Sequence, residues 1–174
     1  FVSYQHDDRD PESLGHNAVS AICEDSAKNL WIGTYDLGLD LFDRKTGRFT
    51  HFLHDDENPR SLSHNRVRVI FEDSTGTLWV GTYRGLNRFV RETGTFQRHL
   101  HDPQTPGSLS NDRIRDIFED REENLWIGTN RGLNRFDRNT ETFTHYTKRD
   151  GLPNNVIYCI SEDDHGNLWV STNR

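Results

Sequence analysis

A five-residue segment, Leu-Trp-Ile/Val-Gly/Ser-Thr, recurs four times along the chain and constrains its fold more than any other feature. The copies are nearly evenly spaced, since their tryptophans follow one another at 48, 47 and 43 residues, as Trp31, Trp79, Trp126 and Trp169. Self-similarity at such a period is the signature of a repeat architecture, in which each unit buries its apolar face against its neighbour. The chain is therefore predicted to consist of similar stacked units.

Each unit has the pattern of four short strands. Runs of β-branched and aromatic residues alternate with turns rich in Gly, Asn, Asp and Ser, and no long stretch has helical spacing. In the second unit the strands are predicted near residues 67–73, 78–82, 86–90 and 96–100. Hairpin-length connections join three of the four strands, which makes a meander and not a coil. Four such strands in each unit indicate the blade of a β-propeller and disfavour a solenoid.

The positions of the repeats in the sequence predict an all-β partial propeller over residues 1–174, with about three and a half four-stranded antiparallel blades. Residues 1–7 match residues 49–55 and are predicted to be the outer strand of a preceding blade. The blades are predicted at 19–55, 67–102 and 114–149, with two strands of a further blade at 156–172. Such a chain is a fragment, a four-bladed ring closed by its own first strand, or half of a two-chain ring. We favour the fragment.

The composition argues against a membrane-spanning segment and against a nucleic-acid partner. The 174 residues include 28% charged residues and have a mean hydropathy of -0.90, so no apolar run is long enough to cross a bilayer. The formal net charge of -7, with basic and acidic residues interspersed, disfavours nucleic acid as a partner. Cys23 and Cys159 lie at non-equivalent places in distant repeats and are interpreted as packing residues without a disulfide.

Residues 61–89, SLSHNRVRVIFEDSTGTLWVGTYRGLNRF, resemble the two-component regulator propeller repeat, and the likeness recurs in all four copies. The resemblance implies a periplasmic or otherwise extracytoplasmic sensor region of a two-component-type signalling protein, with its membrane segment and output module outside this chain. It implies a carbohydrate or other small ligand, with an oligosaccharide expected in gut bacterial members. Ser171 departs from the pattern, because the other copies have glycine at this position.

The four tryptophans are interpreted as structural. Aromatic faces can stack on sugars, but a residue present at the same strand position in every blade is expected to pack between sheets. The repeated glycines are expected to serve close strand approach and tight turns.

No catalytic group, metal site or cofactor is predicted. Each repeat carries a Glu-Asp pair at 24–25, 72–73, 119–120 or 162–163, but adjacent strand residues point to opposite faces and cannot act together on one bond. The nine histidines have no zinc-site spacing, and those on the outer strands, such as His51 and His99, are expected to face solvent.

Loops on one side of the predicted propeller are the candidate for recognition. The connections between blades and the turns from strand two to strand three emerge on the same side, and both sets vary among repeats, with Asn173-Arg174 forming the last of these turns. Variable side chains on a rigid scaffold are where binding commonly occurs. The predicted ligand contacts are Tyr35, Asp36, Tyr83, Arg84, Asn130 and Arg131.

Three functions fit this pattern to different degrees. The leading hypothesis is a non-catalytic sensor propeller that binds a ligand on this loop face. The alternative is a structural or protein-interaction propeller, which associates with further blades or a second copy through its strand edges. An enzyme would require an unrepeated catalytic group near the axis, and the sequence offers no candidate.

Overall fold

The computed structural model describes residues 1–173, and Arg174 lies outside the described residues. The fold is all-β apart from one short 3-10 turn, η1 (Lys148–Asp150). The strands in chain order are β1 (Val19–Glu24), β2 (Leu30–Thr34), β3 (Leu39–Asp43), β4 (Arg48–Phe52), β5 (Val67–Glu72), β6 (Leu78–Thr82), β7 (Gly85–Val90), β8 (Thr95–His99), β9 (Ile114–Glu119), β10 (Leu125–Thr129), β11 (Leu133–Asp137), β12 (Thr142–Tyr146), β13 (Ile157–Glu162) and β14 (Leu168–Thr172).

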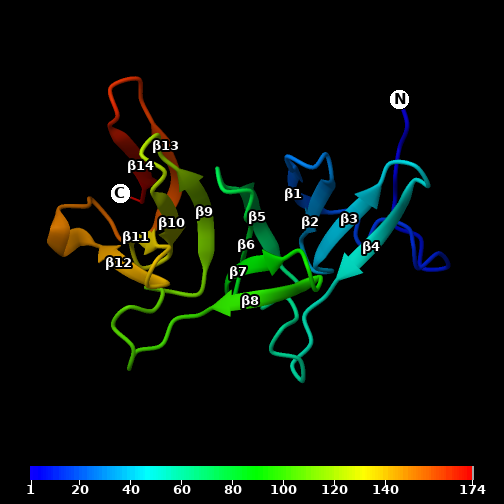
Figure 1. Cartoon of the computed structure of the whole chain (residues 1–174), viewed down its shortest axis with the longest axis horizontal. Helices are drawn as coiled ribbons and strands as arrows, with labels where there is room; N and C mark the ends of the chain where they lie inside the picture. The colour runs from blue at the N-terminus through cyan, green and yellow to red at the C-terminus, as the bar shows by residue number, and fades with distance from the viewer. Residues whose placement is uncertain (174) are drawn as a thin grey trace.

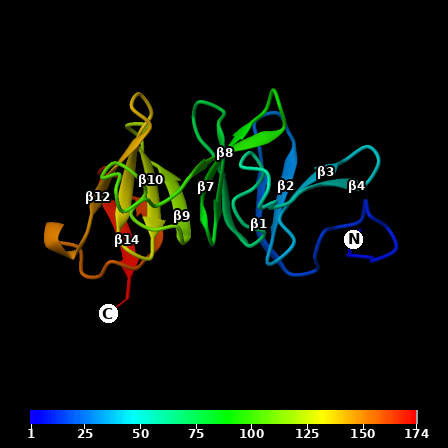
Figure 2. The same cartoon turned by 90° about the horizontal axis from the view of Figure 1, so that it is seen from below.

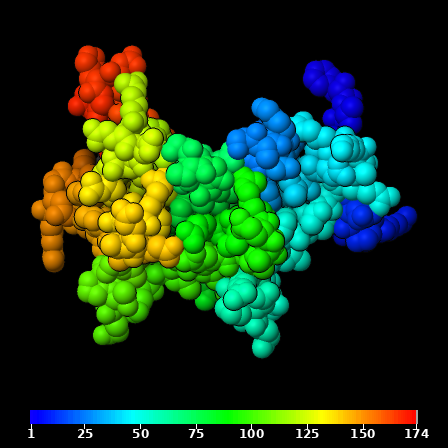
Figure 3. Space-filling model, viewed as in Figure 1, coloured from blue at the N-terminus to red at the C-terminus, as the bar shows by residue number. Residues whose placement is uncertain are grey.

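These strands form three four-stranded antiparallel meanders and one two-stranded sheet, β13-β14. The sheets follow one another in an arc (Figure 1), and the view from below shows them side by side as separate blades (Figure 2). The first strands of successive sheets, β1, β5, β9 and β13, contact one another and are therefore innermost. The space-filling surface leaves a notch between the first blade and the last two strands (Figure 3). The predicted fold, a partial β-propeller with about three and a half blades, is confirmed.

The predicted strands of the second unit agree with β5 to β8 to within a residue at each end. Residues 1–7, predicted to be an outer strand, form no strand, because a strand requires a hydrogen-bonded neighbour and none of the described strands pairs with this segment. Tyr4 instead packs edge-on against Phe42, with ring centroids 4.7 Å apart, and the backbone N–H of His6 donates to Asn17. None of the helices described for residues 1–173 is long and apolar enough to cross a membrane.

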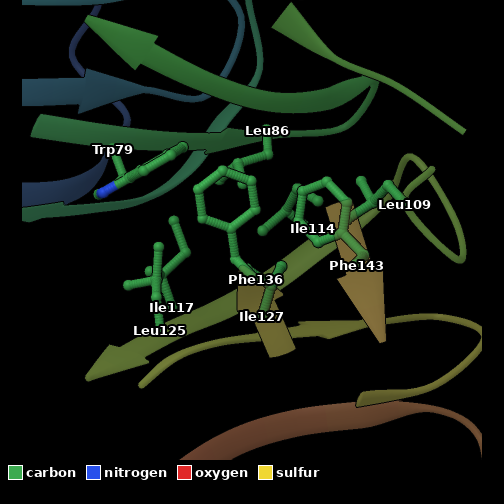
Figure 4. Close-up of a cluster of buried hydrophobic side chains, with 9 residues drawn as sticks. All are labelled: Trp79, Leu86, Leu109, Ile114, Ile117, Leu125, Ile127, Phe136 and Phe143. Atoms are coloured by element: carbon green, nitrogen blue, oxygen red, sulfur yellow. The ribbon is translucent and has the colours of Figure 1, made fainter. Parts of the chain in front are cut away.

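The hydrophobic core lies between blades. Figure 4 shows one such cluster, in which Trp79 and Leu86 of the second blade face side chains of the third blade such as Ile114 and Phe136. The rings of Trp79 and Phe136 meet edge-on with centroids 5.2 Å apart. Trp31 repeats this contact one blade earlier, against Phe89 at 4.9 Å. Trp31 and Trp79 therefore each join their own sheet to the next one.

A glycine in each of the first three Leu-Trp-Ile/Val-Gly-Thr segments allows the next blade to approach. A Cβ at Gly81 would lie 2.5 Å from Cγ2 of Ile114, the first residue of β9. Gly33 and Gly128 have the same relation to Val67 and Ile157, at 2.5 and 2.8 Å. These glycines are needed for blade packing rather than for an unusual backbone conformation.

The aspartates of the first two Glu-Asp pairs, Asp25 and Asp73, are part of the same joint. Asp25 accepts hydrogen bonds from the Trp31 indole at 2.9 Å and from Arg91 of the next blade at 2.8 Å. Arg91 also bonds Glu72 at 2.7 Å, so one guanidinium bridges carboxylates of two blades. Burial alone would raise the pKa of Asp25, but these hydrogen bonds together with those from Asn29 outweigh burial and lower the pKa to about 2.

Two expectations about side chains need correction. Cys23 packs against the core cluster around Trp31, whereas Cys159, also interpreted as a packing residue, is exposed on β13 because no further sheet covers its side chain. His99, expected to face solvent, is only 8% exposed. It occupies the place of Phe52 in the first blade and Tyr146 in the third, and its ring contacts Trp79 at 5.8 Å.

Replacing His99 by phenylalanine is expected to stabilise the fold. The His99 Nε2 atom is buried without a hydrogen-bond partner among the described residues, and burial lowers the pKa of the ring. Since the unfolded chain then binds a proton more readily than the folded chain, His99 reduces stability increasingly as pH falls below about 6.5. His99→Phe should raise the free energy of unfolding by about 1 kcal/mol at pH 7 and by more at pH 5.

Urea unfolding of both proteins at the two pH values measures this difference. His54→Phe is the matched control, because His54 Nδ1 is within hydrogen-bond distance of the Leu62 carbonyl, at 2.7 Å, and its loss should destabilise. An equal or lower stability of His99→Phe at pH 5 would show that the buried ring has a partner in solution.

Candidate ligand-binding surface

The turns from strand two to strand three lie beside the connections between blades, as predicted from topology. The N–H of Tyr35 donates to the carbonyl of Ala18, and that of Tyr83 donates to Arg66, at 3.0 and 3.1 Å. The N–H of Gly85 crosses to the next blade and bonds the carbonyl of Asp112 at 2.8 Å. One face of the propeller is thus built from both sets of variable loops and from the adjoining ends of the inner strands.

The centre of this face is a stack of rings and guanidinium groups. Arg66, immediately before β5, lies with its Cζ atom 4.3 Å from the ring centroid of Tyr35 in the first blade and 4.8 Å from that of Tyr83 in the second. The Arg66 guanidinium also donates to Asp36 at 2.7 Å, which orients it between the two rings. A guanidinium between two aromatic faces combines cation–π attraction with planar stacking.

The stack continues into the third blade. Arg113, immediately before β9, lies 5.2 Å from the Tyr83 ring centroid, and Arg68 of β5 lies 5.8 Å from it. Arg115 of β9 donates to the Asn130 side chain at 2.7 Å and lies 5.1 Å from the ring of Tyr158 in β13. We define the arginine–tyrosine surface as these side chains of four successive blades: Tyr35, Arg66, Arg68, Tyr83, Arg113, Arg115 and Tyr158.

The positive charge of this surface acts on Tyr83. The Arg66 guanidinium is the main cause that lowers the pKa of the Tyr83 phenol, and the charges of Arg68 and Arg115 act in the same direction. Desolvation opposes this shift. The phenol therefore senses the field of several guanidinium groups at once.

The structure separates the six predicted ligand contacts into two groups. Tyr35 and Tyr83 belong to the arginine–tyrosine surface, and Asp36 and Asn130 contact its arginines. Arg84 and Arg131 are exposed, and no hydrogen bond or ion pair of their side chains occurs in the described part of the chain. Arg84 lines a separate cavity of about 160 Å³ together with His54, Ser63, Arg98 and Asp112.

Sequence reasoning missed the four arginines that form most of this surface. A signal was present, since each pair flanks the β-branched residue that opens an inner strand, in Arg66-Val67-Arg68 and Arg113-Ile114-Arg115. The equivalent positions in the first and last repeats are Ala18 and Ser20, and Val156 and Tyr158. Residues that differ among blades around a repeated core position are not needed for the fold, and this difference marks them as functional candidates.

Over residues 1–173 no group of three His, Cys, Asp or Glu side chains is placed to hold a metal ion. The carboxylate near the inner strands, Asp116, accepts the backbone N–H groups of Ile160 and Ile117 at 2.7 and 3.0 Å. Burial raises the pKa of Asp116, and its bond from Ile160 joins the third and fourth blades.

The fold is thus a partial β-propeller whose unrepeated side chains gather on one face. The sequence matches the family model of the two component regulator propeller four times, at residues 13–36, 61–84, 108–131 and 151–174. These matches cover more than half of the chain, and the chain belongs to the two-component regulator propeller family. No curated protein matches it in sequence.

Solved structures agree with this family. The extracellular domain of a hybrid two component system, BT3049 of B. thetaiotaomicron, is 29% identical with a TM-score of 0.81 over 90% of this chain. The chain spans only 22% of that protein's length. Virginiamycin B lyase from Staphylococcus aureus is 16% identical with a TM-score of 0.63, over 88% of this chain and 48% of the lyase. The second likeness shows the propeller fold alone, whereas the first relates this chain to the extracellular part of a signalling system.

Proposed function

We propose that this chain is a non-catalytic, ligand-sensing region of a two-component-type signalling protein, located outside the cytoplasm. The arginine–tyrosine surface is its ligand-binding site, and an oligosaccharide is the class of ligand. The family and the likeness to an extracellular domain support the signalling context. Binding to loops that join several blades would couple ligand occupancy to the relative position of those blades.

One observation carries the proposal. Side chains that differ from repeat to repeat converge from four successive blades on one surface, while the residues that pack the blades are repeated. Tyrosine rings offer flat faces for sugar rings, and arginine and asparagine offer hydrogen-bond donors that fix a ligand's orientation. A surface of this composition fits a polar ligand with flat apolar faces, which describes an oligosaccharide.

A ligand that binds only the folded chain raises its melting temperature, by roughly 5 °C or more at about 100 times Kd. Oligosaccharides of galactose, galacturonate and sulfated galactose, equal in length, are screened against the chain by thermal melting. The proposal expects at least one to raise the melting temperature, and expects Tyr83→Ala to abolish the rise. Tyr4→Ala is the control, because Tyr4 packs on Phe42 and Phe49 of the outer strands. A response that Tyr83→Ala leaves intact would contradict the site.

A second candidate, association through the blade faces, has its own supporting observation. Ile22 is 66% exposed although its equivalents Ile70, Ile117 and Ile160 are at most 8% exposed, and Trp169 is 64% exposed. Both side chains occupy positions that a neighbouring blade covers elsewhere in the chain. Light scattering tests this, since association through these faces gives a mass above 20.3 kDa that Trp169→Lys lowers.

A further inference from the structure

The arginines of the arginine–tyrosine surface have fewer carboxylate partners than the arginines at the blade joints. Arg91 and Arg138, at the blade joints, each bond two carboxylates. On the arginine–tyrosine surface Arg66 alone has an ion pair, with Asp36. Within residues 1–173 the side chains of Arg68 and Arg113 have neither an ion pair nor a hydrogen bond, and Arg115 bonds the uncharged Asn130.

This excess of positive charge is local. The chain carries 28 acidic and 21 basic residues, so a carboxylate partner for each arginine was available in composition. Guanidinium groups that share one aromatic ring repel one another, and such repulsion reduces stability unless an anion offsets it. The arrangement is not a requirement of the repeat either, because the first and last blades have Ala18, Ser20, Val156 and Tyr158 at these positions.

The geometry suits an anionic group. Arg68 and Arg113 approach the Tyr83 ring from two neighbouring blades. Arg115 lies two residues after Arg113, in strand β9. Guanidinium forks bind carboxylate, sulfate and phosphate oxygens in a bidentate manner, and their charge-assisted hydrogen bonds are stronger than neutral ones. The Tyr83 ring beside them provides the apolar face against which the rest of a ligand can pack.

We propose that the ligand of this surface is an acidic oligosaccharide, whose carboxylate or sulfate group is bound by Arg68, Arg113 and Arg115 while a sugar ring packs on Tyr83. This inference rests on the proposed function and narrows its ligand class. The lowered pKa of the Tyr83 phenol agrees with an electropositive surface and supplies a second readout, because a bound anion would raise that pKa.

The experiment compares three galactose-based oligosaccharides of equal length, neutral, uronate-containing and sulfated, by titration calorimetry on the 174-residue chain. We expect one or both acidic ligands to bind at least tenfold more tightly than the neutral one. We expect Arg68→Gln/Arg113→Gln to weaken the acidic ligand tenfold or more and the neutral one little. The relative affinity of the two acidic ligands distinguishes a carboxylate from a sulfate.

A loss of stability is not expected to explain the weaker binding of the double arginine variant. Because the side chains of Arg68 and Arg113 have no ion pair or hydrogen bond within the described chain and repel each other across the Tyr83 ring, the double variant should melt at the same or a higher temperature than wild type. Arg9→Gln/Lys45→Gln removes the same charge from exposed positions elsewhere and should leave the affinity unchanged. The alkaline titration of Tyr83, measured as the difference in absorbance between each protein and its Tyr83→Phe form, should move to higher pH with acidic ligand in wild type and in the Arg9→Gln/Lys45→Gln control. It should not move in the Arg68→Gln/Arg113→Gln variant.

Two outcomes would overturn the inference in different ways. If neutral and acidic ligands bind equally, and Tyr83→Ala weakens both, the surface is a sugar site without anion selectivity, and the proposed function stands. If acidic ligands bind but the control variant weakens them as much as the arginine variant does, binding follows net charge, and both the inference and the proposed site are wrong.

Discussion

Replacing Trp79 by alanine is expected to lower the free energy of unfolding by about 3–5 kcal/mol. The side chain is 1% exposed, its ring meets Phe136 of the next blade, and its indole N–H donates to Asp73 at 2.8 Å. Truncation therefore creates a cavity between two blades and also deprives a buried carboxylate of a donor. Urea unfolding followed by circular dichroism measures the loss.

Trp169→Ala is the matched control for this prediction. Trp169 has the same place in its repeat and the same indole hydrogen bond, to Asp163 at 2.9 Å, but it is 64% exposed. Its truncation should cost about 1 kcal/mol or less, in line with a surface residue and one exposed hydrogen bond. Similar losses for the two variants would mean that the tryptophans do not act through packing between blades.

Gly81→Ala is expected to lower the free energy of unfolding by about 1–3 kcal/mol although it adds a single methyl group. The new Cβ would lie 2.5 Å from Cγ2 of Ile114 and 2.6 Å from Cγ1 of Val69, closer than carbon atoms approach. Val69 lies in the same sheet and Ile114 in the next one, so relief of the contact with Ile114 requires the second and third blades to separate. Thermal melting and urea unfolding both report the change.

Ser171→Ala serves as the control for Gly81→Ala, because Ser171 holds the glycine position of the last repeat and is exposed. That variant should change stability by less than about 0.5 kcal/mol. A tolerated Gly81→Ala would show that the blades have room to shift, and would contradict the close approach of Ile114 to β6.

The fold could be predicted from the sequence because its strongest signals are repeated. Four copies of one segment fix the unit, and the alternation within residues 67–100 gives strand positions that agree with β5 to β8. The outer strand expected at residues 1–7 failed because strand structure depends on a neighbour as well as on sequence. His99 was misplaced for a related reason, since burial of an outer-strand side chain is decided by the adjacent blade.

The site was only partly predictable. Topology placed Tyr35 and Tyr83 on the same face, and their rings do lie close to one guanidinium. That guanidinium belongs to Arg66, which could not be found by searching turns alone, because it directly precedes the inner strand β5. Stacking across blades brings together residues about 30 to 50 positions apart, and a single sequence carries no direct record of such contacts.

The position of a bound ligand tests the central claim most directly. A crystal structure of the chain with the oligosaccharide that raises its melting temperature most would locate that position. The account predicts a ligand in contact with the Tyr83 ring and with arginines of both the second and third blades. A ligand seated instead on the outer strands, or in the cavity lined by His54 and Arg84, would contradict the assignment of the arginine–tyrosine surface as the sensing site.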